Sequence, residues 1–256
     1  MTAQPPGRRW RQALARALRD ERGFTLIELL VAGLAGIVVT AALGAIVVTS
    51  VHFSSNYTDR VDANQEGRIA MEKITQALNS SCVASQVAPV VSTGSTGAYV
   101  TDDTHLYFYT SLTDGPVVTP NLDEVALAGT SLVINTYPYA SGSAPYATNP
   151  NPWTFGSTGP TFTLLPHATQ SVSGGTTLPV FQYYGYTTGG AIASTAFTTP
   201  LTTANAANTA KVVINFRAQP SDSNNTVNRS VDLSNSVVLR LTPASATTGA
   251  TNIPCS

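Results

Sequence analysis

The hydrophobic pattern of the chain begins with one long apolar run. Residues 24–48 read FTLIELLVAGLAGIVVTAALGAIVV and contain a single ionisable side chain, Glu28. At about 1.5 Å of helical rise per residue, this run is long enough to cross the hydrocarbon core of a bilayer. We therefore predict a transmembrane helix over residues 24–50.

The next segment has the spacing of an amphipathic helix. Between residues 51 and 80, apolar side chains recur at helical intervals, first at Phe53, Tyr57 and Val61. No proline interrupts this segment, so the helix can continue from the membrane into it. A polar stretch around Gly67 predicts a bend or an exposed section, because glycine weakens a helix interior.

Beyond residue 80 the pattern changes to short strands between polar loops. Runs rich in β-branched and aromatic residues predict strands within 105–111, 125–137, 161–165 and 178–186. Segments rich in Gly, Pro, Ser, Thr and Asn predict surface loops and a tail at 138–160, 187–210 and 243–254.

Two C-terminal segments alternate strictly enough to predict which side chains face inward. In 211–218 these are Val212, Ile214 and Phe216, and in 231–242 they are Val237, Leu239 and Leu241. The polar stretch 221–228 between the two segments predicts a hairpin loop. Together with the helix, these strands predict an α+β protein whose residues 81–256 form a β-rich globular domain.

Charge adds an orientation to this picture. Six of the 13 basic residues lie in the first 23 positions with only two acids, whereas the remainder holds seven basic and 12 acidic residues. The positive-inside rule places the arginine-rich segment in the cytoplasm and the domain outside it. The acidic balance beyond residue 50 argues against nucleic acid as a partner.

Two ordinary explanations of the apolar run fit less well. A secretory signal peptide has an apolar core of about 7–15 residues followed by a small-residue cleavage site. A plain membrane anchor has the right length but gives no reason for Glu28, since an isolated carboxylate in hydrocarbon is costly and needs a partner or a function.

The sequence around Glu28 offers a third explanation. The ten residues GFTLIELLVA at 23–32 resemble the processing and methylation signal of type IV prepilins and type II secretion pseudopilins. In that family a membrane-embedded prepilin peptidase cuts after the glycine and methylates the new N-terminus. The resemblance implies a leader peptide over 1–23, a cut between Gly23 and Phe24, and N-methylation of Phe24.

The resemblance also implies an assembly role for Glu28, which would meet the N-terminal amine of a neighbouring subunit in a filament. Glu28 lies one helical turn beyond Phe24, on the same face. Burying an amine and a carboxylate together costs less than burying either alone. Capping of its own helix by Glu28 is the alternative, and the two roles are compatible.

The membrane helix carries a second pattern that fits assembly. Ala32, Gly36, Thr40 and Gly44 recur at every fourth position, a stripe of small residues that lets another helix approach closely.

The layout as a whole resembles the larger minor pilins or pseudopilins of the PilW/PulJ type. This implies a pilin-like fold, in which a long N-terminal helix packs on an antiparallel sheet with long loops. The implied function is a structural subunit that helps to initiate or cap a filament. Its implied partners are prepilin peptidase, other pilin or pseudopilin subunits, an inner-membrane assembly platform, and membrane lipid before assembly. A tip adhesin or DNA-capture module is the alternative.

The two cysteines, Cys82 and Cys255, both fall in the part predicted to lie outside the cytoplasm, where disulfides persist. One bridge between them would close a loop of about 170 residues and stabilise the domain by about 5 kcal/mol before strain. Free or intermolecular thiols are the alternative.

Few features of the sequence point to catalysis or to metal binding. The three histidines are far apart, and no nucleophile elbow, zinc-protease motif, phosphate loop or paired-cysteine motif occurs. Asp102 and Asp103 beside His105 predict a solvated turn before a strand. The oxygen-rich residues Asp222, Asn224 and Asn228 are calcium candidates, but their spacing fits no EF-hand and lacks a bidentate glutamate. We expect neither a cofactor nor enzymatic activity.

Overall fold

The computed structural model describes residues 24–81, 88–95, 98–111, 120–141, 153–221, 229–239, 241–242 and 253–254. The chain divides into two compact units, Met1–Ser55 and Asn56–Ser256. One helix, α2 (Leu26–Asn79), begins in the first unit and ends in the second. The predicted leader peptide and the two cysteines lie outside the described residues.

The first unit, as far as it is described, consists of the N-terminal half of α2. Its side chains are exposed from Phe24 to Ser55. This helix is long and apolar enough to span a membrane, on length and composition alone.

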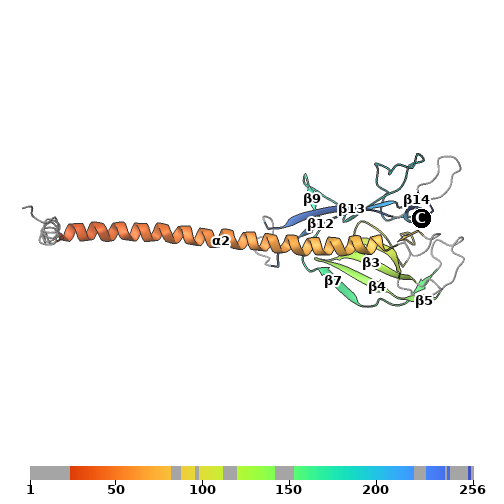
Figure 1. The fold of residues 1–256 in the computed structure, drawn as a ribbon, viewed down its shortest axis with the longest axis horizontal. Helices are drawn as coiled ribbons and strands as arrows, with labels where there is room; N and C mark the ends of the chain where they lie inside the picture. Colours follow the sequence, from red (N-terminus) through yellow and green to blue (C-terminus); the bar gives the residue numbers. More distant parts are fainter. Residues whose placement is uncertain are drawn as a thin grey trace, which may run out of the picture. The chain divides into compact units, whose positions relative to one another are not determined.

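The second unit contains two antiparallel sheets and the C-terminal part of α2 (Figure 1). The first sheet has five strands in the order β1-β2-β3-β4-β7. Their bounds are β1 Val90–Val91, β2 His105–Ser111, β3 Pro120–Ala128, β4 Ser131–Tyr137 and β7 Thr161–Leu165. The second sheet has the order β11-β12-β13, with β8 also paired to β12. Its bounds are β8 Ala168–Thr169, β11 Phe181–Tyr184, β12 Lys211–Ala218 and β13 Val231–Val238.

Short elements complete the domain. Three two-stranded pairs join β5 to β6, β9 to β10 and β14 to β15, and one short helix, α3, precedes β12. Their bounds are β5 Tyr139–Ser141, β6 Thr154–Phe155, β9 Val172–Ser173, β10 Thr176–Thr177, α3 Thr203–Ala207, β14 Leu241–Thr242 and β15 Ile253–Pro254. The long helix α2 together with antiparallel sheets confirms the predicted α+β class.

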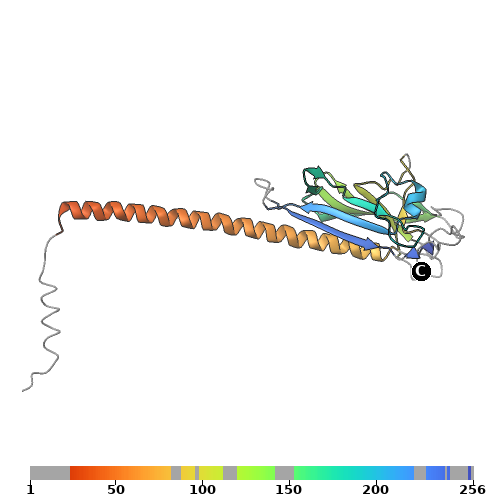
Figure 2. The ribbon, with the colours of Figure 1, turned by 90° about the horizontal axis from the view of Figure 1, so that it is seen from above.

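The main core lies where both sheets meet α2, and both views place the sheets beside the C-terminal part of this helix (Figures 1 and 2). The helix contributes Ala63, Ala70, Met71, Ile74 and Leu78. On β12 the alternation holds as predicted, because Val212, Ile214 and Phe216 are fully buried. In the segment 231–242, Val237 and Leu239 are buried as predicted, whereas Val238 is half-exposed. The segment is not one strand, because β13 ends at Val238 and Leu241 lies in the separate strand β14.

The helix continues unbroken through Gly67, and the polar stretch around it is largely exposed, which is one of the two predicted alternatives; Gly67 itself is not exposed. Gly67 is buried inside an unbroken α2, facing Leu233 of β13 and Ala218 of β12. A Cβ at this position would overlap the Leu233 side chain and approach the Ala218 Cβ to 3.0 Å. The missing side chain therefore lets the second sheet approach the helix closely.

Two loop and strand predictions also need correction. The run 125–137 is not one strand but a hairpin, in which β3 and β4 pair across a turn at Gly129 with φ 62°. The segment 187–210 is not a simple surface loop, because it forms α3 and fully buries Leu201 and Ala210. Thr202 caps α3 by accepting a hydrogen bond from the Asn205 N–H at 3.1 Å.

Candidate functional site

The N-terminal end of α2 is closed by two hydrogen-bonded side chains. The Glu28 Oε2 accepts hydrogen bonds from the Thr25 N–H at 3.1 Å and from the Thr25 hydroxyl at 3.0 Å. The Thr25 hydroxyl oxygen in turn accepts from the Glu28 N–H at 3.3 Å. This reciprocal pair is a capping box, which satisfies amides that have no partner in the first turn of a helix. Glu28 therefore caps its own helix.

The other oxygen of this carboxylate is available. Within the described chain, Glu28 Oε1 accepts no hydrogen bond, since both bonds from Thr25 reach Oε2. Phe24, which precedes the cap, is 83% exposed. The geometry thus leaves Glu28 able to accept a second donor from outside the chain, next to the end of the apolar helix. Gly23 lies outside the described residues.

The stripe of small residues runs along the exposed part of α2. Ala32, Gly36, Thr40 and Gly44 succeed one another at every fourth position, and nothing lies within 4 Å of a Cβ built at Gly36 or Gly44. The Thr40 hydroxyl donates to the Gly36 carbonyl at 2.6 Å, so its polarity is satisfied within the helix. The stripe therefore offers a small surface without unpaired polar groups, flanked by large apolar side chains that are also exposed.

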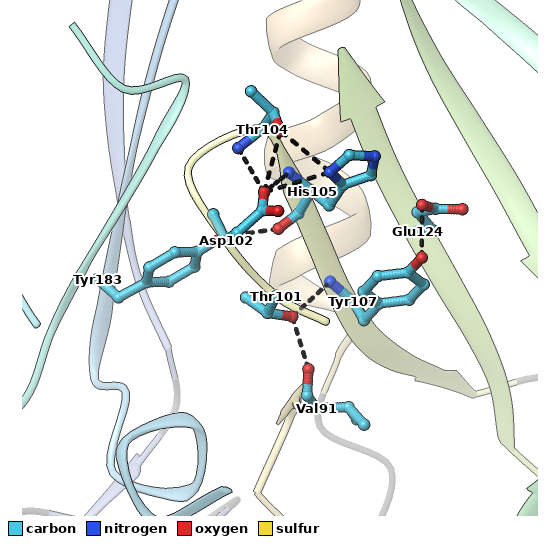
Figure 3. A network of polar contacts seen from close by, with 8 residues as sticks. All are labelled: Val91, Thr101, Asp102, Thr104, His105, Tyr107, Glu124 and Tyr183. Atoms are coloured by element: carbon cyan, nitrogen blue, oxygen red, sulfur yellow. Dashed lines mark hydrogen bonds and ion pairs between the residues drawn. The ribbon is translucent and has the colours of Figure 1, made fainter. Parts of the chain in front are cut away.

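The domain holds a separate polar cluster where β2 begins (Figure 3). One oxygen of the Asp102 carboxylate accepts from the N–H groups of Thr104 and His105, each at 2.7 Å, and lies 3.2 Å from the His105 Nδ1. Partial burial alone would raise the pKa of Asp102, but the hydrogen bonds from His105 and Thr104 together lower it to about 2. The hydrogen bond to Asp102 raises the pKa of His105, against the opposing effect of burial.

This cluster joins the two sheets. The hydroxyl of Tyr183, on β11, donates to the carbonyls of Asp102 at 2.8 Å and His105 at 3.1 Å. Burial raises the pKa of Tyr183, so its hydroxyl stays protonated and can donate. Within the five-stranded sheet, Thr101 connects β1 to β2, since its hydroxyl donates to the Val91 carbonyl and accepts from the Tyr107 N–H (Figure 3). The predicted turn precedes β2, but its Asp102 and His105 side chains are half-buried rather than fully solvated.

The cluster predicts a pH-dependent stability. Because the folded pKa of His105 is raised above 6.5, its contribution is complete below that pH and is lost as pH rises through the folded value. The Asp102 contribution is present above pH 3.8 and is lost as pH falls toward about 2. His105 is 39% exposed on its side chain, so solvent screening keeps the effect below about 1 kcal/mol.

Thermal melts of the wild type and of His105→Gln between about pH 5 and pH 8 test this expectation. The wild-type Tm should fall further than that of the variant, by at most about 2–4 °C. Equal pH dependence of the two proteins would contradict a stabilising Asp102–His105 pair.

Sequence reasoning missed one further feature, a cluster of aromatic side chains on the outer face of the five-stranded sheet. The signal was present in 105–111, where every position from Leu106 to Tyr109 is apolar or aromatic, as in a strand buried on both faces.

The remaining predicted site residues lie outside the described part of the chain. They are Cys82, Cys255, Asp222, Asn224 and Asn228. Among the residues that are described, no group of three or more His, Cys, Asp and Glu side chains is placed to hold a metal ion.

Comparison with known proteins returned no match to a family model, a curated protein or a solved structure.

Proposed function

We propose that this chain is a prepilin-like subunit of a type IV pilus or type II secretion filament. A prepilin peptidase cuts it between Gly23 and Phe24 and methylates the new amine. The observation that carries the proposal is the ten-residue signal at 23–32, placed directly at the start of an apolar helix whose side chains are exposed from Phe24 to Ser55.

The position of the cut agrees with the local structure. Phe24 and Thr25 precede the first helical residue, Leu26, so cleavage after Gly23 leaves α2 intact on the mature chain. Glycine at the scissile position presents no side chain to the peptidase. The mature chain then begins with a positive amine close to the carboxylate of Glu28.

Glu28 has two compatible roles in this proposal. Its Oε2 keeps the capping box with Thr25, while its Oε1 accepts the Phe24 amine of a neighbouring subunit. In hydrocarbon this pairing offsets part of the cost of each charge, and it favours the register in which the two groups meet. The stripe from Ala32 to Gly44 then lets the neighbouring helix pack closely.

The architecture supports a pilin-like fold for the extracytoplasmic domain, because the C-terminal part of α2 packs against antiparallel sheets through Ala63, Gly67 and Ala70. The large domain and its long connections favour a minor subunit of the PilW/PulJ type over a compact major one. Such a subunit waits in the membrane bilayer, joins the inner-membrane assembly platform, and initiates or caps a filament with other pilin-like subunits.

Gly23→Leu is the variant that tests processing, since a large side chain blocks entry of the scissile bond into the peptidase. We expect the variant to accumulate in the membrane as the full 256-residue precursor, while the wild type is shortened to 233 residues. Ala17→Leu, which introduces the same side chain within the leader, is the matched control and should be processed normally. Normal processing of Gly23→Leu, judged by intact mass, would contradict the proposal.

A further inference from the structure

The five-stranded sheet carries the aromatic cluster on the face opposite the main core. Side chains alternate along β2, so that Leu106 and Phe108 enter the main core while Tyr107 and Tyr109 enter this second cluster. The other members come from neighbouring strands and connections. They are Val91, Tyr99, Leu122, Tyr137, Tyr139, Trp153 and Phe155.

A pocket of about 210 Å³ opens in this cluster. Four rings line it, together with Val91, Thr93 and Thr154. Trp153 meets Tyr109 at 81° with centroids 5.0 Å apart, and Phe155 meets Tyr99 at 84° with centroids 6.1 Å apart. Phe155 and Tyr109 are tilted by 34°, with centroids 5.9 Å apart. The pocket is thus an aromatic box, smaller than the roughly 300–1,000 Å³ of sites for drug-sized ligands.

The two threonine hydroxyls at the pocket are already engaged within the protein. The Thr93 hydroxyl donates to the Tyr99 carbonyl and accepts from the Tyr99 N–H, both at 3.1 Å. The Thr154 hydroxyl lies 2.6 Å from that of Ser141. A ligand that needs hydrogen bonds from these threonines, such as a neutral sugar, gains little here. The aromatic rings are then the groups that can interact with a ligand, and the negative quadrupoles of their faces attract cations.

A buried carboxylate lies within the same cluster. Glu124, on β3, is 5% exposed and accepts hydrogen bonds from the Tyr107 hydroxyl at 2.6 Å, the Tyr137 hydroxyl at 2.9 Å and the Asn135 amide at 2.9 Å. Figure 3 shows Glu124 facing Tyr107. The Tyr107 ring in turn packs on Tyr99, a wall of the pocket, with centroids 5.7 Å apart. This charge makes the box more favourable for a cation than for a neutral group of equal size.

We propose that this pocket binds the methylated ammonium group of a quaternary ammonium compound, such as a choline head group. Methyl groups fill an apolar box without requiring hydrogen bonds, while the positive charge meets the ring faces and the field of Glu124. The site rests on the domain alone and is independent of the proposed role in filament assembly.

Trp153 provides a direct probe, because the chain has only one other tryptophan, Trp10. The full chain carrying Trp10→Phe is purified in a maltoside detergent, whose head group contains no ammonium. Choline, tetramethylammonium and phosphocholine are titrated separately at constant ionic strength. The neutral isostere 3,3-dimethylbutan-1-ol is the matched control ligand. Choline and tetramethylammonium represent free ammonium ions, whereas phosphocholine represents a phosphorylated lipid head group. Comparing them shows which of these two sources of an ammonium group the pocket prefers.

We expect a saturable change in Trp153 fluorescence with at least one ammonium ligand, and at least about tenfold weaker binding of the neutral isostere. Tyr99→Leu and Glu124→Gln should each weaken ammonium binding, the first by about tenfold or more. Phe162→Leu, an exposed aromatic on β7 outside the pocket, should leave it unchanged. Thermal melts check that each variant is folded. Equal binding of the neutral isostere, or no saturable change with any ammonium ligand, would overturn the proposal.

Discussion

Glu28→Ala is expected to insert into the membrane and to be processed, yet to fail to enter a filament. Removing the carboxylate makes the helix more apolar, so insertion should be at least as efficient as in the wild type. In the proposed processing, prepilin peptidase recognises Gly23 and the adjoining apolar run, which the substitution leaves in place. The substitution removes the proposed acceptor for the Phe24 amine of a neighbouring subunit. That amine would then be buried without a counter-charge.

The structure supplies a sharper variant, because a capping box works with glutamine as well as with glutamate. Glu28→Gln keeps the hydrogen bonds to Thr25 but removes the charge. If charge pairing is what assembly requires, Glu28→Gln should lose co-purification with partner pilins as completely as Glu28→Ala. Wild-type assembly of Glu28→Gln, with loss only in Glu28→Ala, would reduce Glu28 to a helix cap.

Gly67→Leu is expected to destabilise the domain by about 2 kcal/mol. Leucine is a better helix former than glycine by somewhat less than about 1 kcal/mol, which opposes the loss. The new side chain, however, overlaps Leu233 and crowds Ala218, and overpacking a close contact costs about 1–3 kcal/mol, with four added carbons near the upper end. For a domain of this size, the Tm should fall by roughly 4–8 °C.

Two companion variants identify the cause of that loss. Gln65→Leu, at an exposed position of the same helix, should change the Tm little. Leu233→Ala should recover part of the stability when combined with Gly67→Leu, because it removes the side chain that is overlapped. A Gly67→Leu melt equal to that of the wild type would contradict the close helix–sheet contact.

The helix and most strands followed from periodicity, but Gly67 shows where local reasoning fails. Glycine is unfavourable in an isolated helix, so its presence in a polar stretch predicted a bend or an exposed section, not a buried contact. In the folded domain only glycine fits at this position, because any side chain would overlap Leu233, which is more than 160 positions away in the sequence. No local pattern contains that partner.

The segment 187–210 and the aromatic pocket were missed for related reasons. The Leu201 side chain is buried in the main core, and its backbone is held there by two residues distant in sequence. The Leu201 carbonyl accepts a hydrogen bond from the Ser92 hydroxyl, and its N–H donates to the Thr101 carbonyl. Tyr99, Tyr109 and Trp153 form one pocket only after the strand order of the sheet is known. The residue types predicted which segments are apolar and which are polar. The buried segment and the pocket depend instead on which segments lie side by side in the folded domain.

The proposed function depends most directly on where the mature chain begins. Intact-mass and N-terminal peptide mass spectrometry of the protein from its native envelope measures this position. We predict a chain of 233 residues that starts at Phe24 and carries one added methyl group on its amine. A mature N-terminus beyond residue 45 would indicate an ordinary signal peptide, and an uncut chain starting at Met1 a plain membrane anchor; either result would contradict the proposal.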